Sequence, residues 1–81
     1  MNENKLLKRI VIDPKVMVGK PVIRGTRLTV QHILGLLALD TTMDDIIQEY
    51  EGLTREDILA CLLFAREAPE DTAFVPLTGE V

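Results

Sequence analysis

Apolar residues recur at helical spacing in three stretches of the chain after residue 29. A side chain at every third or fourth position forms one apolar face on a helix. The first stretch predicts a helix from Val30 to about Leu39, with Thr29 as its N-cap. The positions that define the three faces are Val30, Ile33, Leu34 and Leu37; Ile46, Ile47 and Tyr50; and Ile58, Leu59, Leu62 and Leu63.

Capping residues place the start and the end of the second helix. Thr41 or Thr42 can cap it, and the carboxylates of Asp44 and Asp45 then lie in its first turn. The helix dipole favours anions at that position, which explains both residues without a metal site. Gly52 suits the left-handed conformation that ends many helices.

The third helix should begin directly after this glycine. Thr54, with Asp57 three residues later, resembles a capping box. Pro69 disfavours a helical residue before it, so the helix should stop near Arg66 or Glu67. Two helices joined by a short glycine turn give a helix-turn-helix outline.

The first third of the chain is patterned differently. Residues 1–7 are expected to be a frayed start. Residues 9–12 are β-prone and are stopped by an Asp-Pro pair, and Val22-Ile23 can form a second short strand. Two such strands are too little for an independent sheet, so they must lie on the helices or pair with a second subunit.

The predicted fold is therefore mostly α: a three-helix core, a short β-prone N-terminal arm and a loose C-terminal tail. Residues 8–66 form the single domain, and residues 67–81 form an acidic and apolar tail that orders only against its own domain, a second subunit or another protein. A chain of 81 residues buries only about 60–65% of its unfolded surface. Aromatic residues make up 4% of the chain, so the core should be aliphatic, and a homodimer or higher homo-oligomer would support it.

Charge is distributed unevenly along the chain. The formal net charge is −4, yet residues 1–30 carry seven cations against two acids, and residues 31–81 carry two cations against eleven acids. This asymmetry allows a basic face that binds an acidic partner or nucleic acid. It equally allows attraction between the two halves of the chain.

Few residues offer catalytic chemistry. Cys61 is the only cysteine and lies in an apolar helical run, which predicts a buried structural thiol. His32 is the only histidine, and we expect it to be a surface or hydrogen-bonded residue. Neither zinc-ligand spacing nor a phosphate-binding glycine loop occurs, so we expect no metal, no cofactor and no enzymatic activity. A charged start and the lack of ~18 consecutive apolar residues predict a cytoplasmic protein.

The nine residues 19–27, with the sequence GKPVIRGTR, combine two glycines, one proline and three cations. Glycine can take a positive φ, whereas proline holds φ near −65°. This combination predicts a particular backbone path that presents Lys20, Arg24 and Arg27 outward.

This motif, the helix that follows it and the segments at residues 46–50 and 53–58 resemble domain-of-unknown-function family 433 over roughly residues 8–66. The resemblance implies a homeodomain-like three-helix core in a small prokaryotic protein. It also implies an antitoxin that binds and neutralises a PIN-like ribonuclease toxin, and it allows binding of operator DNA.

The candidate binding residues follow from this expectation. An arginine on a stiff loop can form bidentate pairs with the clustered carboxylates of a PIN-like active site. Alternatively, Arg24 and Arg27 are structural and pair with Asp13, with Asp40 or with helix C-terminal carbonyls. The DNA- or partner-binding candidates are Lys20, Arg24, Arg27, Arg9 and Arg55, and the candidates in the tail are Phe74, Val75 and Leu77.

Two other functions are compatible with the same residues. A stand-alone DNA-binding regulator would place the start of the third helix in the major groove, where Arg55 is followed by two carboxylates that repel phosphate. The basic first third would then supply the phosphate contacts. A structural oligomerisation module is the remaining alternative.

Overall fold

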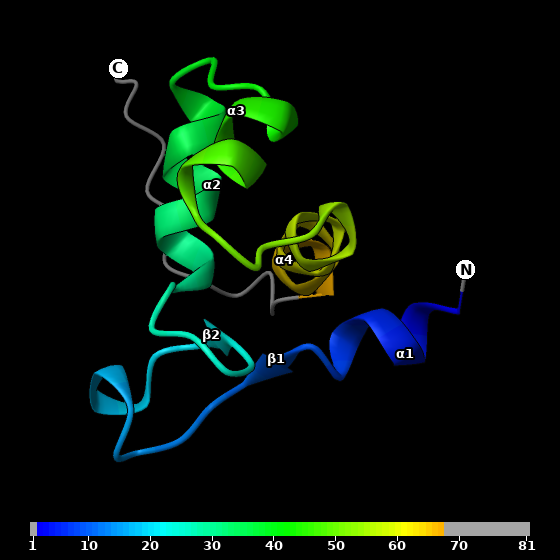
Figure 1. The fold of residues 1–81 in the computed structure, drawn as a ribbon. Helices are drawn as coiled ribbons and strands as arrows, with labels where there is room; N and C mark the ends of the chain where they lie inside the picture. Colours follow the sequence, from blue (N-terminus) through cyan, green and yellow to red (C-terminus); the bar gives the residue numbers. More distant parts are fainter. Residues whose placement is uncertain (1, 68–81) are drawn as a thin grey trace, which may run out of the picture.

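The computed structural model describes residues 2–67, which are mostly helical with a small two-stranded sheet near the N-terminus (Figure 1). The mostly α prediction is confirmed. None of the helices in this part of the chain has the length and apolar character needed to cross a membrane. The elements in chain order are α1 (Glu3–Leu7), β1 (Ile10–Val11), the 3-10 turn η1 (Met17–Gly19), β2 (Val22–Ile23), α2 (Val30–Ala38), α3 (Met43–Glu49) and α4 (Arg55–Glu67).

Thr29 caps α2 as predicted, and Thr42 is the one of the two candidates that caps α3. The Thr29 side chain accepts a hydrogen bond from the backbone N–H of His32 at 3.0 Å, and the Thr42 side chain accepts one from the N–H of Asp45 at 3.1 Å. Each bond satisfies a backbone donor that the helix itself cannot pair. Asp44 and Asp45 lie in the first turn of α3, as expected.

A capping box begins α4. The Thr54 hydroxyl accepts from the N–H of Asp57 at 3.2 Å, and Asp57 Oδ2 accepts from the N–H of Thr54 at 3.0 Å. Gly52 before it has φ +87°, the left-handed conformation predicted for this position. α4 extends from Arg55 to Glu67, which is the last residue that the structure describes.

The core is aliphatic, as the composition predicts. α4 lies at its centre, since it contacts α2 and α3 as well as α1 and β1. The buried residues that form one cluster are Ile23, Val30, Ile33, Ile46, Leu53, Ile58 and Cys61.

The start of the chain differs from the prediction, because residues 3–7 form a helix rather than a frayed end. Asn2 caps α1 by accepting from the N–H of Asn4 at 2.7 Å. α1 packs on α4, and its half-buried residues are Leu6 and Leu7. Tertiary packing therefore stabilises a helix too short to form alone.

Both predicted strands form, and they pair with each other. Ile10 lies opposite Ile23 and Val11 opposite Val22 in an antiparallel ladder. β1 also contacts α4, so the sheet rests on the helices of its own chain. Figure 1 shows β1 and β2 side by side below α4 and α2.

Candidate partner-binding loop

The segment of residues 19–29, here called the basic loop, is attached to the core through β2. The side chains of Val22 and Ile23 are 1% and 2% exposed. The carbonyl of Pro21 accepts a hydrogen bond from the N–H of Val30 at 2.9 Å, so the start of the loop is bonded to the start of α2. Both ends of the basic loop are thus held by the fold.

Hydrogen bonds within the loop define its tip. The N–H of Thr26 donates to the carbonyl of Ile23 at 3.0 Å, which closes a four-residue turn. Gly25 is the third residue of that turn and has φ +81°, as in a type II turn. The Thr26 hydroxyl donates to the same Ile23 carbonyl at 2.8 Å and accepts from the N–H of Leu28 at 3.0 Å. Backbone and side chain therefore both restrain the tip.

The three cations of the loop face solvent. Lys20, Arg24 and Arg27 are all exposed, in agreement with the predicted outward presentation. Among residues 2–67, ion pairs join Arg9 to Asp57 and Arg66 to Glu3, and none involves a cation of the loop. Within the described residues, Arg24 and Arg27 therefore form no ion pair with Asp13 or Asp40.

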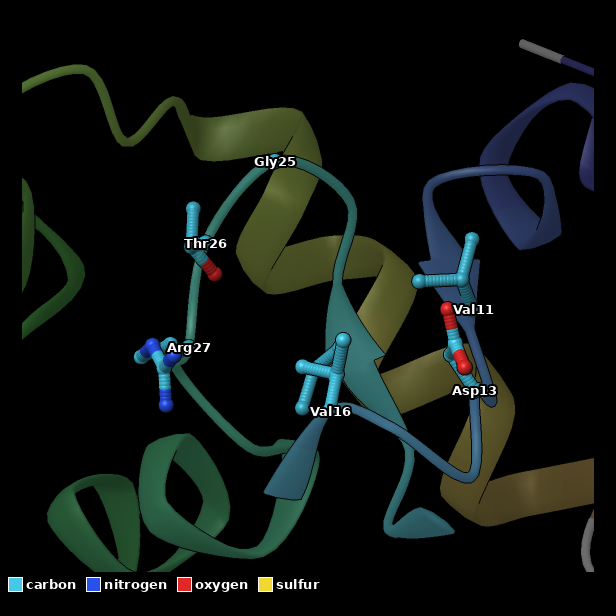
Figure 2. A pocket seen from close by; sticks show the side chains of 7 residues that line it. Val11, Asp13, Val16, Gly25, Thr26 and Arg27 are labelled. Carbon is cyan, nitrogen blue, oxygen red and sulfur yellow. The ribbon is translucent and has the colours of Figure 1, made fainter. Parts of the chain in front are cut away.

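A groove of about 520 Å³ lies beside the basic loop (Figure 2). Figure 2 shows Thr26 and Arg27 on one side and Val11 and Asp13 on the other, with Val16 between them. The groove therefore combines apolar side chains with one exposed guanidinium, Arg27, and one exposed carboxylate, Asp13. The remaining lining residues are Val22 and Gly25.

The residues directly after Val16 form an unusual turn that the sequence does not reveal. Met17, Val18 and Gly19 have φ values of +50°, +56° and +79°. Only Gly19 was expected to need a positive φ, and a β-branched residue in this region is strained. Val18 is also 91% exposed, so the turn holds an apolar side chain in solvent.

Arg9 has a different environment from the cations of the loop. Its Nη1 lies 3.1 Å from Asp57 Oδ1, and Asp57 is only 8% exposed. Because Asp57 Oδ2 also accepts from the Thr54 hydroxyl at 3.0 Å, this carboxylate is satisfied within the chain. Arg9 therefore stabilises the contact between the N-terminal arm and α4, a role that the sequence analysis did not assign to it.

The second ion pair shows how α1 lies along α4. Arg66 Nη1 is 3.6 Å from Glu3 Oε2 near the end of α4, whereas Arg9 meets Asp57 near its beginning. The N-terminal arm therefore runs antiparallel to α4 along its length. Arg55 is exposed at the first residue of that helix. Positions 9 and 57 are far apart in sequence, and no local pattern indicated their pairing.

His32 and Cys61 lie in separate environments. His32 Nε2 and the Tyr50 hydroxyl are 2.8 Å apart and connect α2 to the end of α3 at the surface. Cys61 is fully buried, as predicted, and burial together with the negative charge of Asp57 raises the pKa of its thiol to about 12. A thiol with so high a pKa is a weak nucleophile at neutral pH.

These features describe a small, mostly helical protein with a restrained and exposed basic loop. The chain belongs to the family described as "Protein of unknown function (DUF433)", whose model matches residues 10–65. That range includes the basic loop and α2, α3 and most of α4, and it confirms the resemblance drawn from the sequence motifs.

A curated relative is also similar to part of the chain. An uncharacterized protein of Archaeoglobus fulgidus is 67% identical over 24 residues, which cover 30% of this chain and 67% of the relative. No solved structure matches the chain significantly.

The candidate tail residues Phe74, Val75 and Leu77 lie outside the described residues.

Proposed function

We propose that this protein is an antitoxin-type regulatory protein that binds and neutralises a PIN-like ribonuclease toxin through its basic loop. The observation that carries the proposal is the state of Arg24 and Arg27. Both are exposed on a restrained loop and have no ion-pair partner among residues 2–67. A partner with clustered carboxylates would supply the missing counter-charges.

The geometry of the loop supports recognition of carboxylates by arginine. A guanidinium can form two parallel hydrogen bonds to one carboxylate, and such charge-assisted pairs are short and directional. The bonds at Ile23, Thr26 and Leu28 already restrain the backbone beneath these side chains. A pre-organised loop loses less conformational entropy on binding than a flexible one.

The proposal includes a homeodomain-like arrangement of α2, α3 and α4, with α3 and α4 as the helix-turn-helix pair. The glycine turn at Gly52 and the 13-residue length of α4 support this arrangement. They do not by themselves favour DNA as the principal ligand. α1 and β1 pack on α4, and Asp57 in its first turn is bonded to Arg9, so little of α4 is free to enter a major groove.

Operator DNA is therefore proposed only as a second ligand, bound by the loop cations through phosphate. Self-association is proposed as well, because Ile12, Val18 and Leu39 are 60%, 91% and 79% exposed. A second copy of the chain would cover these side chains and enlarge the limited core of so small a domain.

The test starts from the untagged chain, recovered from its native cells with whatever protein accompanies it in stoichiometric amount. The affinity for that protein and the inhibition of its ribonuclease activity are then measured for the double variant Arg24→Ala/Arg27→Ala. We expect about 3 kcal/mol of lost binding, or roughly 100-fold, from two charge-assisted contacts. Lys5→Ala/Lys8→Ala removes the same charge from exposed positions outside the loop and is the matched control.

Three outcomes would contradict the proposal. Recovery of the chain without a stoichiometric partner excludes a stable antitoxin complex. A partner that lacks ribonuclease activity excludes the toxin assignment. Unchanged affinity of the Arg24→Ala/Arg27→Ala variant, together with a lowered melting temperature, would make both arginines structural.

A further inference from the structure

A second groove lies between α2 and α3, and we call it the α2–α3 groove. Its volume is about 270 Å³. Its apolar surface comes from the half-buried side chains of Leu36 and Tyr50, together with the buried Ile46. The remaining lining residues are Thr41, Asp45 and Glu49.

The α2–α3 groove is acidic. Asp45 and Glu49 are exposed and lie four residues apart in α3, so their side chains share one face of the helix. Neither carboxylate belongs to an ion pair in the part of the chain that the structure describes. The N–H of Thr41 donates to the carbonyl of Leu36 at 3.1 Å, which holds the two ends of the α2–α3 connection together. A matching ligand would bring an apolar side chain with cations beside it.

Residues 15–20, which we call the lysine turn, have this pattern. Val18 is 91% exposed, and the exposed Lys15 and Lys20 lie on either side of it in the sequence. The N–H of Lys20 donates to the carbonyl of Met17 at 3.1 Å, which closes the turn around Val18. Within residues 2–67 neither lysine forms an ion pair. The lysine turn and the α2–α3 groove are therefore complementary in charge and in apolar surface.

The backbone of the lysine turn is strained at the same residue. Val18 has φ +56°, which is unfavourable for a β-branched side chain. Because this side chain is almost fully exposed, packing within residues 2–67 does not offset the strain. Backbone strain of this kind is concentrated at sites that contact ligands.

The two complementary surfaces are far apart in one molecule. Figure 1 shows the lysine turn, the light blue segment between β1 and β2, at the opposite end of the molecule from α3. One chain therefore cannot bring its own turn and groove together, whereas a second copy supplies the complement of each. Two copies related by a two-fold axis would form the contact twice and leave neither surface open.

We infer that the lysine turn of one chain docks in the α2–α3 groove of a second copy. Val18 then contacts Leu36 and Tyr50 of that copy, and the two lysines lie beside its carboxylates. The contact rests on the self-association included in the proposed function and assigns a surface to it. It does not use Arg24 or Arg27, so these arginines stay available to a toxin.

Charge reversal on each side tests the contact by sedimentation velocity of the full chain alone. Lys15→Glu/Lys20→Glu places carboxylates against carboxylates, and Asp45→Lys/Glu49→Lys places lysines against lysines. Each double variant should weaken self-association by at least about 10-fold. A mixture of the two variants should associate as tightly as the parent chain, because every reversed charge then meets an opposite one.

Matched variants control for net charge. Lys5→Glu/Lys8→Glu and Asp44→Lys/Glu51→Lys make the same changes at exposed positions outside the lysine turn and the α2–α3 groove. Both should leave self-association unchanged. Loss of association in these controls equal to that in the test variants would overturn the inference.

Val18→Asn separates the contact from a role in folding. Asparagine adopts a positive φ more readily than valine, so the melting temperature should stay the same or rise while self-association weakens several-fold. A parent chain that stays monomeric at every concentration would overturn the inference, as would association insensitive to Val18→Asn or to the charge reversals. None of these variants alters Arg24 or Arg27, so such a failure leaves the proposed toxin contact to its own test.

Discussion

Arg9 and Arg27 belong to the same basic first third of the chain, yet the fold gives them different environments. Arg9 is bonded to Asp57, which is nearly buried and is also bonded to Thr54. Arg27 is exposed beside an open groove and has no ion pair within residues 2–67. A positive charge close to a buried carboxylate stabilises the fold, whereas one without a counter-charge is available to a ligand.

The largest expected loss of stability comes from removing Asp57, the partner of Arg9. Asp57→Ala removes the carboxylate that accepts from the N–H and the hydroxyl of Thr54 in the capping box, and it leaves Arg9 without its partner. We expect a loss of about 2–3 kcal/mol in the free energy of unfolding, measured by urea denaturation. Asp44→Ala removes an exposed carboxylate from the first turn of α3 and should cost about 0.5 kcal/mol. Equal losses for the two variants would show that the Arg9–Asp57 contact adds no stability.

A pair of glycine substitutions tests whether the loop is restrained. Gly25→Ala should lower the free energy of unfolding by about 1–2 kcal/mol, because φ at this position is +81° although no atom lies within 4 Å of the added Cβ. Gly35→Ala also meets no atom within 4 Å, but it lies inside α2 and should raise the stability by about 0.5–1 kcal/mol. Effects of the same sign at both positions would contradict a restrained turn at Gly25.

Substitution of the two arginines compares the regions directly. Arg9→Ala removes the ion pair with Asp57 and should lower the free energy of unfolding. The loss should be only about 1 kcal/mol, because Arg9 is partly exposed and solvent screens the pair. Arg27→Ala should change it by less than about 0.5 kcal/mol. Thermal unfolding of both variants at matched ionic strength is the measurement. A greater loss from Arg27→Ala would mean that the loop cation is structural.

The smallest effect near neutral pH is expected at Cys61. Burial raises the pKa of this thiol from 9.0 to about 12, so the folded state disfavours the thiolate. The corresponding stability is fully present below pH 9 and is lost as pH rises from about 9 towards about 12. Cys61→Ala should therefore show a smaller loss of stability over this range than the parent chain.

Reactivity of the same thiol gives a second readout. At neutral pH a thiol reagent should modify Cys61 only at the rate at which the protein unfolds, since the side chain is fully buried. Fast modification of the folded chain would contradict the burial. Asp57→Ala removes a negative charge near the thiol and should lower its pKa.

The helices after residue 29 could be predicted because their signals are local. Thr29, Thr42 and Thr54 cap the helices that follow them, and each cap lies within three residues of the N–H that it accepts from. Gly25 and Gly52 have positive φ values, which glycine adopts readily because it lacks a Cβ. The outward cations of the loop also follow from a short motif.

Contacts across long sequence separations were not predictable in this way. α1 forms because it packs on α4 through Leu6 and Leu7, and nothing within residues 1–7 specifies this contact. The left-handed conformations of Met17 and Val18 run against the intrinsic preference of these residues, so local propensity does not predict them.

The sequence by itself determined the mostly α class, the caps, the aliphatic core and the family, because helical periodicity, capping and a nine-residue motif are readable over short distances. The tertiary structure alone decided which cations are paired. Arg9 meets Asp57 only because β1 runs beside α4, while Arg24 and Arg27 remain exposed on the turn that follows β2. Charge is a property of the residue, but the presence of a counter-charge depends on how the whole chain packs.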